Sequence, residues 1–213
     1  MMHIEVFTFN PFQENTLVLS DDSGACVIVD PGCFEDHEKA ELQAYVEEKG
    51  LKVEGLLNTH CHVDHVLGNA WVARTYGVEL TMHRLDLPTF KANEVVAPQY
   101  GFAAYEAANP VHFVDEGDQI TFGNTTLEIF FTPGHAPGHI VFYHREQGVV
   151  IGGDVLFRGS IGRTDLPGGD FDTLAASIRS KLYTLPEEVV VYPGHGPETN
   201  IGFEKQNNPF VKG

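Results

Sequence analysis

Four side chains that can bind a metal ion lie within six residues of one another, and this cluster constrains the fold more than any other feature. It occurs in the segment Thr59-His60-Cys61-His62-Val63-Asp64-His65. In an extended segment His60 and His62 point to the same side of the chain, because alternate side chains share a face. Asp64 and His65 follow where the pattern changes from strand to helix. Imidazole and carboxylate groups together suit zinc, iron or manganese, so the segment predicts a metal centre at a strand end.

Three later segments place the same kinds of side chain at the ends of apolar runs. They are Thr132-Pro133-Gly134-His135, Gly152-Gly153-Asp154 and Tyr192-Pro193-Gly194-His195. Glycine lets the backbone turn sharply, and a strand end is a rigid platform for a ligand. Taken singly, each segment is typical of an ordinary turn. Because they add His, Asp and His to the first cluster, we predict seven metal ligands: His60, His62, Asp64, His65, His135, Asp154 and His195.

Short apolar runs between turn residues predict strands over residues 4–9, 15–20, 26–29, 55–59, 119–122, 126–132, 140–143, 149–152 and 189–192. Helical spacing of apolar residues predicts helices over 35–49, 64–76 and 171–182. Residues 84–109 are less regular and predict helices or a covering loop. Since strands dominate each half, we expect two stacked sheets with helices outside them. No linker divides the chain, so we expect a single domain over residues 1–213.

The order HxHxDH, then a separate His, Asp and His, resembles the pattern of the metallo-β-lactamase superfamily. The resemblance runs from the early strands and Asp30-Pro31-Gly32 to Pro193-Gly194-His195. It implies an α/β fold of the α+β type, an αβ/βα sandwich of two mixed sheets with helices on the outer faces. It implies one metal ion at His60, His62 and His135, and a second at Asp64, His65 and His195. Asp154 is then the bridge between the two ions.

Residues 157–165 and 194–199, with Glu204 and Asn208-Pro209, resemble the short, bacterial glyoxalase II-like hydrolases of that superfamily. These are hydroxyacylglutathione hydrolases or close relatives. The resemblance implies two divalent metal ions, zinc first and iron or manganese as alternatives. It implies hydrolysis of a small 2-hydroxyacyl thioester, such as S-lactoylglutathione, by a hydroxide shared between the metals. Asp64 and Asp154 are the implied catalytic carboxylates.

Longer glyoxalase II enzymes differ from this chain at the carboxyl-terminal end. They have a helical C-terminal domain whose basic residues bind glutathione. Here 18 residues follow His195, and Lys205 and Lys212 are their only basic side chains. The resemblance therefore favours thioester hydrolysis more strongly than it favours glutathione as the thiol carrier.

The charge balance and the absence of targeting signals limit the expected partners and location. Thirteen Lys and Arg residues against thirty Asp and Glu residues give a formal net charge of −17. Such a surface repels a phosphate backbone, so nucleic acid is not expected as a partner. No stretch approaches the ~18 apolar residues that cross a bilayer, and the first residues lack signal-peptide features. Three cysteines without a CxxC pair favour a reducing compartment, so we expect a cytoplasmic enzyme with a small-molecule thioester substrate and no membrane contact.

Several further residues near the predicted ligands have structural interpretations. His139 is interpreted as a buried structural histidine. Cys61 is expected to point away from its neighbouring ligands and to pack as a small apolar side chain. Asp30 is expected to hold the turn at Pro31-Gly32 and to support the site indirectly.

The patterns also suggest roles for two arginines and three aromatic residues. Arg158 and Arg163 are either surface residues or residues that contact an anion or order the loop beside Asp154. Aromatic residues of the 84–109 region are expected to pack within a covering segment rather than line a substrate groove: Tyr100, Phe102 and Tyr105.

The chief alternative is a mononuclear-iron persulfide dioxygenase of the same superfamily, which the chain resembles in Gly162-Arg163-Thr164-Asp165. That family uses ligands equivalent to His60, His135 and Asp154. The intact Pro193-Gly194-His195 ending favours the hydrolase. A nuclease is disfavoured by the net charge, and a β-lactamase by the bridging Asp, which its ligand set usually lacks. A metal-binding module without catalysis is a third possibility.

Overall fold

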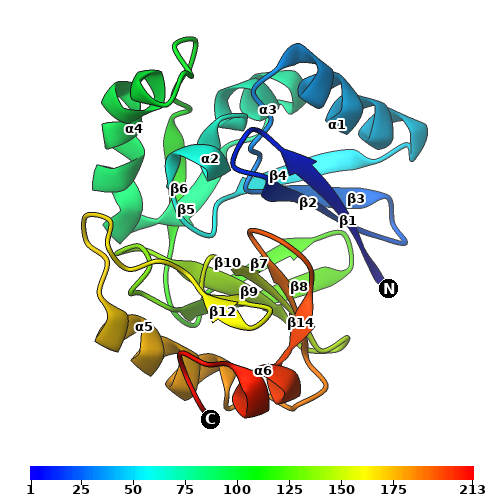
Figure 1. Cartoon of the computed structure of the whole chain (residues 1–213). Helices are drawn as coiled ribbons and strands as arrows, with labels where there is room; N and C mark the ends of the chain where they lie inside the picture. Colours follow the sequence, from blue (N-terminus) through cyan, green and yellow to red (C-terminus); the bar gives the residue numbers. More distant parts are fainter.

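Two six-stranded sheets lie face to face in the computed structural model (Figure 1). The structure describes residues 1–213, apart from the side chain of Val111. The first sheet consists of β1 (Met2–Phe9), β2 (Glu14–Asp21), β3 (Ala25–Val29), β4 (Lys52–Leu57), β5 (Leu80–His83) and β6 (Pro110–Val114), in that order. Its first three strands pair antiparallel and the remaining pairs are parallel, so the sheet is mixed.

The second sheet is also mixed and uses strands from the later half of the chain. Its order is β14 (Thr199–Asn200), β13 (Val190–Pro193), β10 (Val149–Gly153), β9 (Ile140–His144), β8 (Thr125–Phe131) and β7 (Gln119–Phe122). β10 and β13 run parallel, and the other pairs are antiparallel. A small hairpin, β11 (Leu156–Phe157) with β12 (Ser160–Ile161), follows β10.

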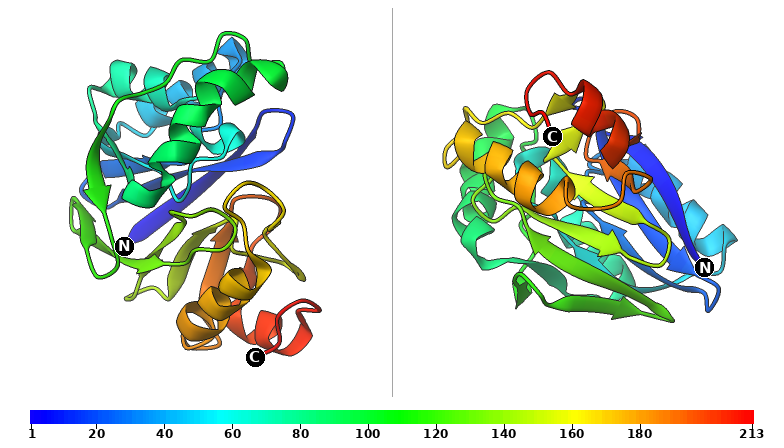
Figure 2. Two further views of the ribbon diagram at one scale, coloured as in Figure 1. Left: turned by 90° about the vertical axis from the view of Figure 1, so that its left-hand side faces the viewer. Right: turned by 90° about the horizontal axis from the view of Figure 1, so that it is seen from below.

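Helices cover the outer face of each sheet (Figures 1 and 2). The first sheet is covered by α1 (Asp36–Glu48), α2 (Val63–Val66), α3 (Asn69–Tyr76), the short turn η1 (Arg84–Asp86) and α4 (Leu87–Gln99). The second is covered by α5 (Phe171–Ser177), the π-helical turn η2 (Ile178–Leu182) and α6 (Ile201–Asn207). This arrangement confirms the predicted αβ/βα sandwich. None of the helices in the described part of the chain has the length and apolar character needed to cross a membrane.

Alternating side chains of the central strands build three apolar layers. In β3, Val27 and Val29 pack in the cluster between the two sheets, whereas Cys26 and Ile28 pack toward the helices. β9 and β10 alternate in the same way between the inter-sheet cluster and the cluster under α5 and α6. Because both faces of these strands are buried, their sequences are continuous apolar runs, as in sheets covered on both sides.

One buried carboxylate joins the ends of the two sheets away from the strand ends that carry the predicted ligands. Asp21, at the end of β2, accepts hydrogen bonds from the backbone N–H of Asn124 (2.5 Å) and the hydroxyl of Thr125 (3.2 Å) in the second sheet. It also accepts one from the backbone N–H of Ser23 at 2.8 Å. Burial raises the pKa of Asp21, but the hydrogen bonds from Ser23 and Asn124 outweigh burial and lower it to about 2. The ionised carboxylate therefore stabilises this junction.

The structure differs from the predicted elements in several places. The predicted helix 64–76 is divided into α2 and α3 at Gly68, whose N–H donates to the carbonyl of Pro31 at 2.7 Å. A side chain at this glycine would overlap Cys33. The predicted helix 171–182 continues from α5 into a π-helical turn. β5, β6, β14 and α6 were not predicted, and the irregular region 84–109 contains η1 and α4.

Candidate metal centre

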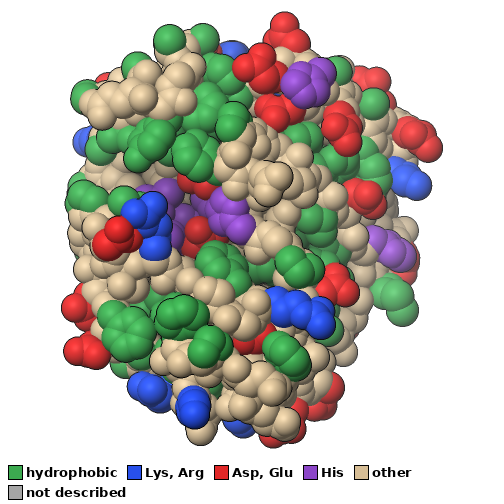
Figure 3. Space-filling model, in the orientation of Figure 1, with side chains coloured by type: hydrophobic (Ala, Val, Ile, Leu, Met, Phe, Trp, Pro, Cys, Tyr) green, Lys and Arg blue, Asp and Glu red, His purple; other side chains and the backbone are tan. Residues whose placement is uncertain are grey.

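The seven predicted ligands come from the carboxyl ends of strands and converge in one place. Residues 60–65 follow β4, His135 follows β8, Asp154 follows β10 and His195 follows β13. Since β10 and β13 are parallel neighbours, their carboxyl ends meet at the same edge of the sheet. Figure 3 shows histidines at the base of a hollow between the two halves of the molecule.

The first group of side chains consists of His60, His62 and His135, whose ring nitrogens can hold one ion. Nδ1 of His62 lies 2.8 Å from Nε2 of His135. Nε2 of His135 lies 3.3 Å from Nε2 of His60. His60 and His135 are almost completely buried, so the three nitrogens meet in a site with little access to bulk water.

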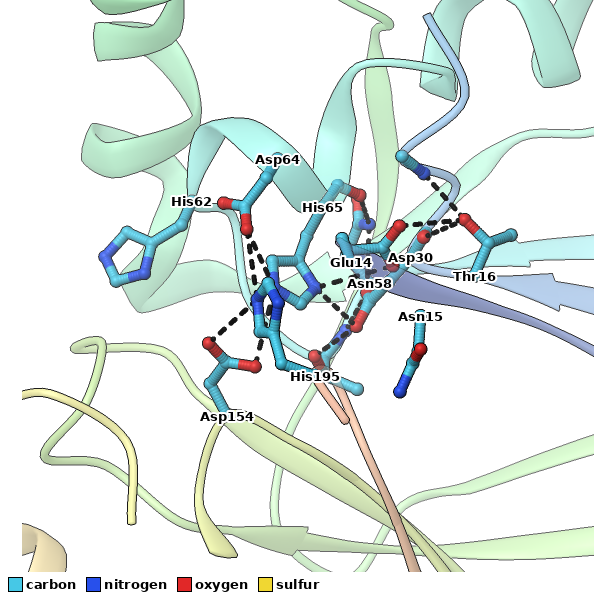
Figure 4. A network of polar contacts seen from close by, with 12 residues as sticks. Glu14, Asn15, Thr16, Asp30, Asn58, His62, Asp64, His65, Asp154 and His195 are labelled. Carbon is cyan, nitrogen blue, oxygen red and sulfur yellow. Dashed lines mark hydrogen bonds and ion pairs between the residues drawn. The ribbon is translucent and has the colours of Figure 1, made fainter. Parts of the chain in front are cut away.

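The second group consists of Asp64, His65 and His195 (Figure 4). Oδ2 of Asp64 lies 3.1 Å from Nε2 of His195 and 3.6 Å from Nε2 of His65. The rings of His65 and His195 stand edge to face, with centroids 5.3 Å apart. Their nitrogens and the carboxylate oxygen face a common point.

Asp154 lies between the two groups. Its Oδ2 is 3.5 Å from Nε2 of His135 in the first group and 3.5 Å from Nε2 of His195 in the second. Its Oδ1 is 3.5 Å from Nε2 of His65. The side chain thus contacts both groups at once, which is the position that a bridging carboxylate requires.

Hydrogen bonds fix which nitrogen of four histidines faces the centre. In each ring Nδ1 donates outward to an oxygen: His60 to Thr59 Oγ1 (3.1 Å), His65 to Asp30 Oδ2 (3.2 Å), His135 to the carbonyl of Arg163 (2.8 Å) and His195 to the carbonyl of Phe12 (3.1 Å). An imidazole that donates through one nitrogen offers the lone pair of the other as an acceptor. The four Nε2 atoms therefore point inward, where each neutral ring can offer a lone pair to a cation.

This arrangement leaves acceptors facing acceptors, which fits bound cations. With both Nδ1 atoms protonated, Nε2 of His60 and Nε2 of His135 cannot hydrogen-bond to each other. Nε2 of His65 and Oδ1 of Asp154 are buried and have no hydrogen-bond partner among the described residues. Buried polar atoms normally find a partner. Nitrogen and carboxylate donors in this number are the ligands of zinc and similar divalent ions, so the residues present fit a metal centre.

The electrostatics of the site also favour positive charge. Burial, together with neighbouring histidines, lowers the pKa of His60 well below its ordinary value and that of His62 to about 3. Both rings are therefore neutral and able to act as ligands. Burial opposes a charge on His65, but Asp64 and Asp154 outweigh it and raise the pKa of His65 well above its ordinary value. Burial also opposes ionisation of Asp154, yet His65 and His135 hold its pKa far below its usual range.

Two glycines allow the chain to approach the centre closely. A side chain at Gly194 would overlap Oδ1 of Asp154 and the ring of His65. A side chain at Gly162 would overlap the backbone carbonyl of Asp154 and approach Nδ1 of His135. A larger residue would displace Asp154 and His65 at the first position, and the backbone of Asp154 and the ring of His135 at the second.

Asp86, which the sequence did not single out, ties two ligand-bearing loops together. Its Oδ2 accepts from the N–H of Cys61 at 2.5 Å, and its Oδ1 accepts from the N–H of Gly138 at 2.8 Å. The amide of Asn93 donates to the carbonyl of Cys61 at 2.9 Å. The backbone N–H and carbonyl of Cys61, which lies between His60 and His62, are thus both hydrogen-bonded to the 84–99 segment. This segment therefore supports the metal centre and does not only cover it.

Glu14 is a second buried carboxylate that the sequence did not single out. It is fully buried, and Oε1 lies 3.8 Å from Nδ1 of His65. Its other oxygen accepts from the hydroxyl of Thr16 at 2.9 Å. Burial raises the pKa of Glu14 well above its ordinary value. His65 is distant from Glu14 in the sequence, so no local pattern indicates this contact.

The residues with structural interpretations lie close to their expected positions. His139 is fully buried, accepts from the N–H of Asp154 at 3.0 Å and stacks on His60. Cys61 is buried, and its sulfur lies 3.9 Å from that of Met82, away from the ligands. Asp30 supports the site more directly than expected, because its carboxylate accepts from Thr59 (2.7 Å) and His65. The turn after Asp30 is instead held by the side chains of Asn10 and Thr16, which hydrogen-bond to the backbone of Gly32.

The aromatic and basic residues near the site divide into two kinds. Phe102 is buried, and Tyr105 is partly buried against the same clusters, as expected for packing residues. Tyr100 is 55% exposed, which differs from the expected packing role. Arg163 is exposed and pairs with Asp165, while its carbonyl holds His135. The guanidinium of Arg158 lies over the ring of Phe203, 5.5 Å from its centroid.

The sequence matches the metallo-beta-lactamase superfamily over residues 9–195. The chain therefore belongs to this superfamily, whose fold binds divalent metals and whose members include metal-dependent hydrolases. It is 39% identical over 212 residues to the hydroxyacylglutathione hydrolase GloC of Haemophilus influenzae, covering 99% of this chain and 98% of that protein. It is 38% identical over 205 residues to the probable metallo-hydrolase YqgX of Bacillus subtilis, covering 95% and 94%.

Solved structures of the same fold bear several different names. TTHA1623 in a di-iron-bound form has a TM-score of 0.86 and 39% identity, covering 97% of this chain and all of that one. The B3 metallo-beta-lactamase BLEG-1 has a TM-score of 0.84 and 34% identity, covering 99% and 100%. ETHE1 from Myxococcus xanthus has a TM-score of 0.81 and 25% identity, covering 99% and 84%. The fold is thus shared among proteins with different names, and the site must decide the chemistry.

Proposed function

We propose that the chain is a dinuclear metal-dependent hydrolase of small 2-hydroxyacyl thioesters, such as S-lactoylglutathione. One observation carries the proposal: Asp64, His65 and His195 form a second complete ligand group on the other side of Asp154. A one-metal enzyme would have no use for this group. His60, His62 and His135 would hold one divalent cation, the second group would hold another, and Asp154 would touch both.

The bound cations would supply a water molecule acidified toward neutral pH and a Lewis acid for the thioester carbonyl oxygen. The chain's own residues supply the frame. Asp154 and Asp64 place two negative charges beside the inward-facing nitrogens, and the outward hydrogen bonds of the histidines keep each ring in position. A thiol of pKa about 8.5 leaves readily as thiolate, so no side chain needs to act as a general acid. The absence of a need for a general acid agrees with a site whose central side chains are all candidate metal ligands.

Three further points support the proposed substrate class and metals. GloC, a hydroxyacylglutathione hydrolase by name, aligns along nearly the whole chain. The net charge of −17 opposes binding of nucleic acid. The donor set of imidazole and carboxylate suits zinc, which we propose as the first choice, and iron, which a structural neighbour holds as a pair.

A persulfide dioxygenase is the second candidate, because the stretch Gly162-Arg163-Thr164-Asp165 resembles that family, and the structural likeness to ETHE1 leaves it open. In that case His60, His135 and Asp154 would hold a single iron. The two candidates differ in their need for oxygen, because hydrolysis consumes water alone.

The test uses one batch of protein divided and loaded with zinc, iron or manganese. Thiol release from S-lactoylglutathione is measured without oxygen, and oxygen uptake with glutathione persulfide is measured in air. We expect anaerobic thiol release that His195→Ala reduces strongly. Oxygen uptake with persulfide, combined with no thiol release from any thioester, would overturn the hydrolase proposal in favour of the dioxygenase.

A further inference from the structure

Two exposed aromatic rings meet beside the candidate metal centre, and we call them the aromatic rim: Phe12 and Tyr100. Phe12 lies in the turn between β1 and β2, and Tyr100 follows α4. Their exposed fractions are 40% and 55%, and their rings stand edge to face with centroids 5.5 Å apart. The ring of Phe12 also lies 6.1 Å from that of Phe102, which is buried and packs against Phe34. The rim is therefore supported from below by a fixed apolar base.

The rim is joined to the metal centre through the backbone of Phe12. The carbonyl of Phe12 accepts the hydrogen bond of His195 at 3.1 Å. Arg163, whose carbonyl accepts from His135 at 2.8 Å, lies in the loop after β12 that borders the same centre. Figure 3 shows hydrophobic side chains bordering the hollow that contains the histidines.

The chemistry around the rim favours an apolar group over an anionic one. The guanidinium of Arg163 makes two hydrogen bonds to Asp165, at 2.6 and 2.7 Å. Arg158 lies over the ring of Phe203. Both arginines of this loop are thus engaged, and a carboxylate of the substrate would have to compete with Asp165. An apolar group against Phe12 and Tyr100 removes two exposed rings from water, which is favourable in proportion to the area covered.

We infer that the aromatic rim binds an apolar portion of the thioester, so that within the proposed class of 2-hydroxyacyl thioesters an aliphatic or aromatic substituent raises kcat/KM above that of a substrate with a polar or anionic group in its place. The inference rests on the proposed thioester hydrolysis and adds a substrate class to it. The apolar portion can belong to the acyl group or to the thiol, and two series of substrates separate these cases.

The first series keeps N-acetylcysteamine as the thiol and varies the acyl group from lactoyl to 2-hydroxyhexanoyl to mandeloyl. The second keeps lactoyl and varies the thiol from glutathione to N-acetylcysteamine to benzyl mercaptan. We expect kcat/KM to rise along one series, by up to about fourfold for each methylene group that is fully buried. The series that responds identifies the part of the substrate at the rim.

Variants then locate the effect. Phe12→Ala and Tyr100→Ala should lower kcat/KM about tenfold more for the preferred apolar substrate than for S-lactoyl-N-acetylcysteamine, as expected for the loss of an aromatic contact. Phe171→Ala, which removes an exposed ring of α5, is the matched control and should not change this ratio. Calorimetric binding of the non-hydrolysable S-benzyl-N-acetylcysteamine to metal-free protein gives a second readout, which Tyr100→Ala should weaken.

The outcomes distinguish the two proposals. If thioesters are hydrolysed with equal kcat/KM along both series, the rim has no such role and the hydrolase proposal stands. If Phe171→Ala changes the ratio of the two kcat/KM values as much as Phe12→Ala and Tyr100→Ala do, the proposed role of the aromatic rim is also wrong. If no thioester is hydrolysed with any metal, both proposals fail together.

Discussion

Replacing Asp86 by asparagine removes the charge that joins two ligand-bearing loops. The carboxylate accepts from Cys61 at 2.5 Å and from Gly138 at 2.8 Å, and it is fully buried. An asparagine has one acceptor oxygen, so its NH₂ group would face one of the two N–H donors. A hydrogen bond to a charged group contributes about 1.5–3 kcal/mol. We therefore expect Asp86→Asn to lower the free energy of unfolding of the metal-free protein by about 1.5–3 kcal/mol.

The same change should weaken metal binding unequally at the two groups. Cys61 lies between His60 and His62, and Gly138 lies in the loop that carries His135. Loss of such supporting contacts typically costs about 10–100-fold in metal affinity, and we expect this loss at the first group and a smaller one at the second. Urea unfolding and competition with a chromophoric chelator measure the two effects. The control is Asp172→Asn, an exposed carboxylate on α5. Equal stability and equal metal affinity in both variants would refute the role of Asp86.

Three further predictions concern single side chains. Asp154→Asn should keep the fold but lower kcat at least about 100-fold, because a neutral amide bridges two cations poorly; wild-type kcat and metal content would show that Asp154 is not the bridge. Cys61→Ala should keep most of the activity, since the thiol packs against Met82, and complete loss of thioester hydrolysis by a correctly folded variant would indicate a catalytic thiol. Asp21 has a folded pKa of about 2 against about 3.9 when unfolded, so it stabilises the protein by about 2.5 kcal/mol above about pH 5, and this contribution is lost as the pH falls toward 2. The difference in unfolding free energy between metal-free wild type and Asp21→Asn should therefore shrink between about pH 5 and pH 2, whereas a constant difference would contradict the assigned cause.

The positions of the candidate ligands could be predicted because their signals are local. His60, His62, Asp64 and His65 share one segment, and each of the other three follows an apolar run that ends in glycine. In the structure those runs are β8, β10 and β13. β10 and β13 are parallel neighbours, and β8 runs in the same direction on the other side of the antiparallel β9, so all three end at one edge of the sheet. A local pattern was therefore enough to indicate convergence. The layering of the sheets followed from the resemblance and from the continuous apolar runs.

Features that depend on distant contacts could not be predicted in this way. The break between α2 and α3 arises because Gly68 lies against Pro31 and Cys33, whereas the helical periodicity of the segment continues through it. Asp86 and Glu14 act on residues 25 or more positions away. Neither residue belongs to a motif. Both are buried by residues that are distant in the sequence, so a local pattern does not indicate their burial.

The number of metal ions bound per chain tests the two-metal proposal most directly. Protein loaded with zinc, iron or manganese and then dialysed against metal-free buffer is analysed for metal and for protein concentration. Two groups of ligands with Asp154 between them predict two ions per chain for at least one metal. His195→Ala should retain about one, because the first group is intact. A firm value of one ion per wild-type chain with all three metals would contradict the dinuclear centre.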